Sequence, residues 1–176
     1  MQVRKIVLTG RPGCGKTTAV MTIVRVLSTA GIAGFYTEEI CERGRREGFR
    51  WHRLDGRTGV LAHIGIKSRY RVGKYGVDIE SFDKEAVPVL DPDAVGVDLF
   101  VIDEIGRMEC FSERFVEAVR RLLDCDKYVL ATVALKGDGL IREVKSHPGI
   151  ELLHLTTENR NEITRQIAGK LAASMR

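Results

Sequence analysis

Long hydrophobic runs are missing from this sequence, and so are the features of a secreted chain. Apolar stretches such as Ile6–Leu8 and Leu99–Ile102 are far too short to cross a bilayer. Thr9 and Gly10 interrupt the first stretch, which therefore lacks the apolar core of a signal peptide. The four cysteines show no CxxC or metal-binding spacing, as is typical of reduced thiols. We therefore expect a cytoplasmic protein without membrane spans, disulfides or a structural zinc site.

The composition that is present is that of a soluble globular protein. Hydrophobic residues make up 44% of the 176 residues and charged residues 30%. The formal net charge of +4 is unevenly distributed. The window 41–76 holds ten lysines and arginines against three acidic residues, a net +7, so the rest of the chain carries −3. The positive charge is therefore a feature of one segment.

Apolar strands alternate with helical patterns along most of the chain. The β-branched run Val3–Leu8 predicts a buried strand, and Lys16–Ala30 has the apolar spacing of a helix. Strands separated by helices predict an α/β fold with a mostly parallel sheet that helices cover on both faces. The further predicted strands are 32–37, 99–102, 128–133 and 150–155, and the further predicted helices are 111–123, 140–145 and 158–173.

The segment from about 39 to 81 differs from this pattern. Glycines are frequent, and the alternation in 49–54 predicts hairpins with arginines on a solvated face. No internal repeat or low-complexity stretch marks a domain boundary. We predict a single domain over 1–176, with an antiparallel basic insertion at about 39–81.

A glycine-rich turn joins the first predicted strand to the first helix. Its sequence, Gly10-Arg11-Pro12-Gly13-Cys14-Gly15-Lys16-Thr17, matches the phosphate-loop pattern G-x-x-x-x-G-K-[ST]. Backbone N–H groups of such a loop converge on phosphate oxygens, and the helix N-terminus adds partial positive charge. Lys16 would reach the β- and γ-phosphates, Thr17 would bind Mg²⁺, and Thr18 would contact an outer phosphate. The turn predicts a P-loop NTPase fold that binds Mg²⁺ with ATP, GTP or another nucleoside triphosphate.

Two acidic residues follow the apolar strand 99–102. A phosphate-loop enzyme needs a carboxylate on another strand to hold the hydration shell of Mg²⁺, and Asp103 fits that position. Glu104 would polarise a water in line with the γ-phosphate. Because a kinase places an acceptor hydroxyl there instead, the pair favours hydrolysis over phosphotransfer. The predicted nucleotide-binding stretch is Leu99-Phe100-Val101-Ile102-Asp103-Glu104-Ile105-Gly106.

Five further residues have both a functional and a structural explanation. Arg107 would contact developing phosphate charge, or it is a surface arginine at the head of a helix. Thr132 would sense the γ-phosphate or water, or it is there because β-branched residues favour strands. Lys136 lies in the loop after that strand, where ligands collect in parallel sheets. Asn159 and Arg160 would face the base, unless capping by the preceding threonines explains them. The predicted catalytic residues are Lys16, Glu104 and Arg107, and the predicted metal ligands are Thr17 and Asp103.

With these motifs placed, the chain resembles the THEP-type nucleoside-triphosphatases, the family that includes the cancer-related nucleoside-triphosphatase of animals. The matching blocks run in family order over nearly the whole chain, and VGKYGVD and DEIGRME are more specific than the phosphate loop. The resemblance implies Mg²⁺-dependent hydrolysis of nucleoside triphosphates to diphosphates and phosphate, with broad base selectivity. At the position of Arg107 the resemblance implies only a positive charge, because lysine also occurs there in this family. The blocks are the phosphate loop, Phe35–Glu39, Arg71–Asp78, Asp103–Glu109, and Lys136-Gly137 followed by Gly139-Leu140-Ile141.

The VGKYGVD block also has an interpretation from its own residues. Gly73 and Gly76 frame Lys74 in a tight loop, so its cation would approach a phosphate closely. The alternative is an ordinary charged hairpin turn.

Two other functions stay open. A small nucleotide or nucleoside kinase would share the size, the fold and the phosphate loop, but would make a phosphorylated acceptor. An ATP-using nucleic-acid-binding module would explain the basic window, in which Phe49, Trp51, Tyr70 and Tyr75 are interleaved with cations. We favour a solvated arginine-rich hairpin face for that window. The sequence does not determine the oligomeric state.

Overall fold

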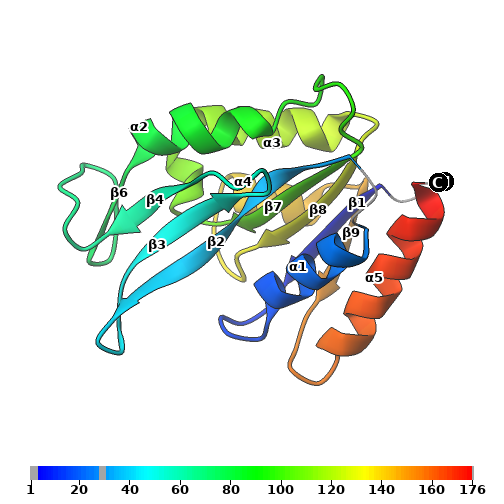
Figure 1. The fold of residues 1–176 in the computed structure, drawn as a ribbon, viewed down its shortest axis with the longest axis horizontal. Helices are drawn as coiled ribbons and strands as arrows, with labels where there is room; N and C mark the ends of the chain where they lie inside the picture. The colour runs from blue at the N-terminus through cyan, green and yellow to red at the C-terminus, as the bar shows by residue number, and fades with distance from the viewer. Residues whose placement is uncertain (1–3, 28–30, 176) are drawn as a thin grey trace.

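A mixed sheet of nine strands forms the centre of the described structure. The computed structural model describes residues 4–27 and 31–175. The strand order is β5-β6-β4-β3-β2-β7-β8-β1-β9 (Figure 1), and the strands from β2 to β9 pair in parallel. The prediction of an α/β fold with a mostly parallel core is therefore confirmed. The parallel strands are β2 (Ile32–Glu42), β7 (Leu99–Ile105), β8 (Tyr128–Val133), β1 (Lys5–Thr9) and β9 (Ile150–His154).

The remaining strands extend this sheet in antiparallel fashion. β3 folds back along β2, β4 pairs with β3, and the short β6 and β5 complete that edge. Trp51 and Leu61 from this region lie in the same apolar cluster as Phe35 of β2. The segment therefore shares the core of the parallel sheet. The antiparallel strands are β3 (Arg45–Arg53), β4 (Thr58–His63), β5 (Arg71–Val72) and β6 (Tyr75–Val77).

Helices cover both faces of the parallel half. α1 (Lys16–Val26) and α5 (Arg160–Ser174) pack together on one face, and α3 (Glu113–Asp124) and α4 (Leu140–Ser146) lie on the other (Figure 1). Ile6 of β1 packs with α1 and α5, whereas the next residue, Val7, packs with α3 and α4. This burial on both sides explains why the strands are continuous apolar runs. Shorter helical turns are α2 (Ile79–Ser81), Phe82–Ala86, Val87–Val89 and Glu109–Phe111. No helix in the described ranges has the length and apolar character needed to cross a membrane.

Two strands are longer than the sequence predicts. The strand expected at 32–37 continues to Glu42, because β3 pairs with it over that whole extension. The strand expected at 99–102 continues to Ile105, so Asp103 and Glu104 lie within β7 and not after it. Val3, predicted to begin the first strand, lies outside the described residues, as do the predicted helix residues 28–30.

The start of α3 also differs from the prediction. The helix begins at Glu113 instead of residue 111, because the Ser112 hydroxyl accepts a hydrogen bond from the backbone N–H of Phe115 at 2.9 Å. A serine in this position caps the helix and fixes its first residue.

Candidate active site

A cavity of about 700 Å³ lies at the carboxyl ends of the parallel strands. In parallel sheets this is the edge at which loops converge and ligands bind. Loops after β1 and β8, the end of β7 and residues of β2, β3, β4 and β5 all contribute to its wall. Its lining residues are Gly10, Pro12, Gly13, Gly15, Lys16, Thr17, Thr37, Glu38, Glu39, Arg46, Phe49, Leu61, Val72, Asp103, Glu104, Gly106, Arg107, Met108, Glu109, Ala134, Leu135 and Lys136.

The predicted phosphate loop lies at one end of this cavity. Gly15 directly precedes α1 and has a φ of +99°, a left-handed conformation that L side chains rarely adopt. A Cβ there would also lie 2.9 Å from Nη1 of Arg160, so the start of α5 packs against the loop. Lys16 bends back along the loop, and its Nζ donates a hydrogen bond to the carbonyl of Gly10 at 3.2 Å. The lysine is therefore held in the cavity by the loop itself.

Asp103 is held by threonines from two different elements. Its Oδ2 accepts a hydrogen bond from Thr17 Oγ1 at 2.6 Å, and its Oδ1 accepts one from Thr132 Oγ1 at 2.6 Å. Burial raises the pKa of the Asp103 carboxyl, while both hydrogen bonds and the charge of Lys16 oppose that rise. Thr132 is fully buried and its hydroxyl is committed to Asp103, so it orients the carboxylate and does not reach a phosphate.

Glu104 faces the same cavity beside Lys16. The pairing of β7 with β8 shifts between Ile102 and Ile105, which inserts one extra residue into β7 at this point. Glu104 Oε2 lies 3.7 Å from Lys16 Nζ, and its side chain keeps 34% of its surface exposed. Burial raises the pKa of the Glu104 carboxyl, Lys16 lowers it, and the charge of Asp103 raises it again. A partly desolvated carboxylate with access to the cavity is suited to accept a proton.

Glu109 was not among the site residues predicted from the sequence. It lines the cavity although it is almost completely buried, and burial raises its pKa to about 8. A Cβ at Gly106 would lie 2.8 Å from Glu109 Oε2 and 3.0 Å from Glu104 Oε1. The two carboxyl groups therefore converge on the space that Gly106 leaves free. Glu109 ends the DEIGRME block, but sequence spacing alone does not bring it back beside Glu104.

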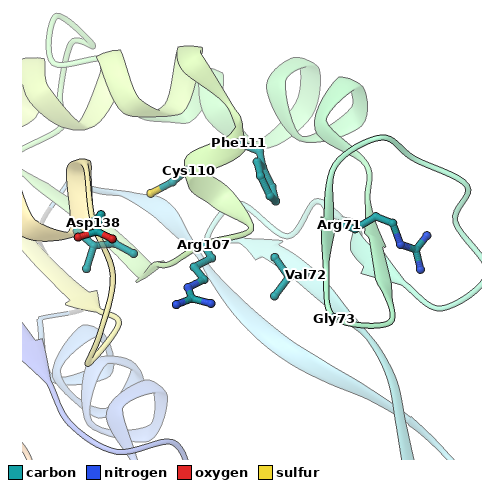
Figure 2. A pocket seen from close by; sticks show the side chains of 8 residues that line it. Arg71, Val72, Gly73, Arg107, Cys110, Phe111 and Asp138 are labelled. Atoms are coloured by element: carbon teal, nitrogen blue, oxygen red, sulfur yellow. The ribbon is translucent and has the colours of Figure 1, made fainter.

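Arg107 and Lys136 also reach the cavity, as the sequence predicted. Both side chains are exposed at its wall. Arg107 and Val72 additionally line a second, adjoining cavity of about 400 Å³ (Figure 2). Arg71 lies at the outer side of this second cavity, and its guanidinium donates a hydrogen bond to the Lys74 carbonyl at 2.9 Å.

Neither residue suggested for the base lines the cavity, although the Arg160 side chain lies against Gly15 of the phosphate loop. Lys74 lines neither cavity, and its Nζ lies over the Tyr75 ring at 5.4 Å. Asn159 and Thr156 exchange two hydrogen bonds, which is the helix capping that was the structural alternative. These two bonds close the turn that directly precedes α5. Several residues of the predicted nucleotide-binding set do not line the cavity: Arg11, Cys14, Thr18, Leu99, Phe100, Val101, Ile102 and Ile105. The last five of these are buried in the sheet core. They flank Asp103 and Glu104 along β7 and so position these two carboxylates.

The donor set at Thr17 and Asp103 fits a magnesium ion. Both are oxygen donors on the wall of one cavity, and their oxygens lie 2.6 Å apart. Mg²⁺ prefers oxygen ligands and takes only one or two from the protein, with water and phosphate supplying the rest. Thr17 and Asp103 are therefore the residues that would hold it.

A phosphate loop between β1 and α1, facing a buried aspartate on another strand, defines a P-loop NTPase. A family model described as NTPase matches residues 5–168. Nucleoside-triphosphatase THEP1 of Thermotoga sp. (strain RQ2) is 41% identical over 167 residues, 95% of each chain. The cancer-related nucleoside-triphosphatase of Homo sapiens is 39% identical over 175 residues, 91% of this chain and 92% of that one. The crystal structure of THEP1 from Aquifex aeolicus superimposes with a TM-score of 0.83 at 37% identity, covering 93% of this chain and 96% of that one. The chain belongs to this NTPase family, and the resemblance seen in its motifs is confirmed.

Proposed function

We propose that this protein is a Mg²⁺-dependent nucleoside-triphosphatase that converts nucleoside triphosphates to diphosphates and phosphate. The observation that carries the proposal is the 3.7 Å approach of Lys16 Nζ to Glu104 Oε2, beside the Thr17–Asp103 pair. This arrangement combines a phosphate-binding cation, a pair of metal-binding oxygens and a candidate general base in one cavity. The names of the relatives, nucleoside-triphosphatases, support the same reaction.

Each of the site residues would have its own role in the reaction. The loop backbone and Lys16 would bind the β- and γ-phosphates, and Glu104 would take the proton of the attacking water. Arg107 would stabilise negative charge that develops on the transferred phosphoryl group. Bound Mg²⁺ would neutralise negative charge on the phosphate oxygens. Residues 1–176 would act as a single domain, with the strands of the 39–81 insertion forming the wall opposite the phosphate loop.

We expect broad base selectivity. Among the described residues that line the cavity there is no asparagine or glutamine, the side chains best suited to read the edge of a base. Recognition would then depend on the triphosphate. We also expect a cytoplasmic location, where the four free thiols stay reduced.

Phosphate release is the test of this function. ATP, GTP, CTP and UTP are each incubated with the purified protein, with Mg²⁺ or with EDTA, and without any acceptor molecule. We expect release from all four nucleotides that requires Mg²⁺. Strict dependence on an added acceptor would contradict the proposal.

The structure favours this function over an ATP-using nucleic-acid-binding module. Of the four aromatic side chains of the basic window, Trp51 is buried and the other three are half-buried against neighbouring rings. Trp51 is 2% exposed, and Tyr70 packs against Phe111 with ring centroids 5.4 Å apart. Phe49 and Tyr75 pack edge to face at 5.3 Å. This packing leaves less aromatic surface for base stacking than the sequence pattern suggests, which supports the triphosphatase over the nucleic-acid-binding module.

A further inference from the structure

Glu109 is a buried acidic residue to which the proposed reaction gives no role. The N–H of Cys110 donates a hydrogen bond to the Gly106 carbonyl at 3.1 Å, and this turn brings Glu109 back beside Gly106. Glu109 is 5% exposed, and no ion pair joins it to a cation in the part of the chain that the structure describes. Because burying a carboxylate without a cation is costly, an acid at this position is not explained by packing.

The Glu104 carboxylate has a different neighbour at each of its oxygens. Its Oε2 lies 3.7 Å from Lys16 Nζ, whereas its Oε1 borders the space beside Gly106. A Cβ at Gly106 would lie 3.0 Å from that oxygen and 2.8 Å from Glu109 Oε2. The carboxyl groups of Glu104 and Glu109 therefore meet at the space that the missing side chain of Gly106 leaves.

Of these two carboxyl groups, Glu109 is the one that keeps a proton at neutral pH. Burial raises its pKa to about 8; hydrogen bonds from backbone N–H groups oppose the rise, and the charges of Glu104 and Asp103 add to it. Glu104 keeps 34% of its side chain exposed and has Lys16 beside it, so a negative charge is more stable there. A protonated carboxyl group donates a hydrogen bond, and an ionised one accepts it.

A bound triphosphate would change what Glu104 contacts. In the described structure Lys16 donates a hydrogen bond to the Gly10 carbonyl and lies beside Glu104. With phosphates in the loop, Lys16 would turn toward the β- and γ-phosphates and leave Glu104 Oε2 to face the water. A general base must be held within hydrogen-bond reach of the proton that it takes. Once Lys16 has turned away, a donor at Oε1 is what can hold Glu104 in place.

We propose that Glu109 is a positioning residue: its protonated carboxyl group donates a hydrogen bond to Glu104 Oε1 beside Gly106 and so aims Glu104 Oε2 at the attacking water. Glu109 keeps its proton throughout, and Glu104 alone takes the proton of the water. Ionisation of Glu109 removes the donor and puts a second negative charge beside Glu104, so turnover falls when Glu109 loses its proton. The proposal rests on the proposed triphosphatase function, in which Glu104 is the general base.

The test compares how kcat depends on pH in the wild type, Glu109→Gln and Glu109→Met, with ATP and Mg²⁺, between about pH 6 and about pH 9.5. The wild-type kcat should fall as the pH rises through about 8. Because the glutamine amide donates a hydrogen bond but does not titrate, Glu109→Gln should stay within about threefold of the wild type at neutral pH and lack this fall. Glu109→Met is of similar length but has no donor. It should lower kcat about ten- to a hundredfold at every pH, while the KM for ATP changes by less than about threefold.

Glu117→Gln is the matched control. It makes the same chemical change at an exposed position on α3 and should leave the wild-type pH profile unchanged. Glu104 and Asp103 act on Glu109 through their charges. Cys110 also interacts with Glu109, but burial raises the pKa of its thiol to about 12, above the range of the experiment. Circular dichroism at each pH shows whether each protein stays folded.

Infrared spectroscopy gives a readout that does not depend on turnover. At neutral pH the difference spectrum between the wild type and Glu109→Gln should contain the carbonyl stretching band of a protonated carboxyl group. Absence of this band would overturn the proposal. So would a fall of kcat near pH 8 that persists in Glu109→Gln, or wild-type turnover in a folded Glu109→Met. These results leave the hydrolase intact, whereas absence of phosphate release from the wild type would contradict the hydrolase and this proposal with it. If Glu109→Met does not fold, the profile of Glu109→Gln decides.

Discussion

Thr132 Oγ1 donates a hydrogen bond to Asp103 Oδ1 at 2.6 Å, deep between two parallel strands. The other oxygen of the same carboxylate accepts the hydroxyl of Thr17 at an equal distance. The carboxylate is only 1% exposed, so no solvent replaces a lost partner. Thr132 thus fixes the orientation in which Asp103 would hold the hydration shell of Mg²⁺, without touching the ion or the nucleotide itself.

Replacing Thr132 by valine preserves its shape and removes this hydrogen bond. One oxygen of Asp103 then stays buried without that partner, and we expect the free energy of unfolding to fall by about 1–3 kcal/mol. The Mg²⁺ concentration needed for half-maximal phosphate release should rise by about ten- to a hundredfold. Urea unfolding and a Mg²⁺ titration of the activity measure the two effects.

Thr9→Val is the matched control. Thr9 ends β1, the strand that pairs with β8, and is almost as buried as Thr132. Its hydroxyl has no hydrogen-bond partner among the described residues. The valine removes a buried hydroxyl that has no partner, so it should not lower the free energy of unfolding and should leave the Mg²⁺ requirement unchanged. Equal effects of the two substitutions would contradict the proposal that Thr132 orients Asp103.

Lys16→Ala and Glu104→Gln should separate binding from chemistry. Lys16 would contact the phosphates in the bound state, so its loss should weaken nucleotide binding at least tenfold and also slow turnover. Glu104→Gln should reduce kcat by about 10²–10⁴ while the Kd of the nucleotide stays within a few-fold. Calorimetry with a non-hydrolysable ATP analogue and steady-state phosphate release measure the two quantities. Substantial activity in Glu104→Gln would refute its assignment as general base.

Gly106→Ala should disturb the two carboxyl groups that share its space. The new Cβ would lie 2.8 Å from Glu109 Oε2 and 3.0 Å from Glu104 Oε1, so both side chains must move. We expect kcat to fall at least tenfold and the free energy of unfolding to fall by about 1–3 kcal/mol. Gly169→Ala in α5 is the control, because open space surrounds that position. It should stabilise the helix by up to about 1 kcal/mol and leave kcat unchanged.

Glu109→Gln should change how stability depends on pH. Burial raises the pKa of Glu109 from 4.5 to about 8, so the folded protein keeps this proton over a range where the unfolded chain has lost it. The unfolded state then binds fewer protons, and this group makes stability fall as the pH rises from about 4.5 to 8. Relative to wild type, Glu109→Gln should gain about 3 kcal/mol between pH 5 and pH 8. Urea unfolding at several pH values tests this, and parallel pH curves for the two proteins would contradict it.

Much of the site could be predicted from local sequence because its chemistry is local. The phosphate loop is one contiguous turn. Its backbone conformation and the phosphates that it would bind require glycines, a lysine and a threonine at fixed positions. Asp103 and Glu104 were predicted from an apolar strand followed by acids, although the strand includes them. The positions of Lys74 and Asn159 could not be predicted in this way. Whether a loop cation reaches a phosphate depends on how its hairpin packs, and Lys74 lies over Tyr75 instead.

The sequence by itself determined the class of fold, the phosphate loop and the strand that carries Asp103, since each depends on neighbours along the chain. Tertiary structure alone decided that Thr132 holds Asp103, and that Glu109 returns to the side of Glu104. It also decided that Phe49 of β3 and Leu61 of β4, two and three strands away from β7, line the same cavity as Glu104. These contacts join residues far apart in the chain, and they depend on strand order and on the burial of side chains. Local pattern does not encode either property, because both arise only when distant segments share one sheet and one core.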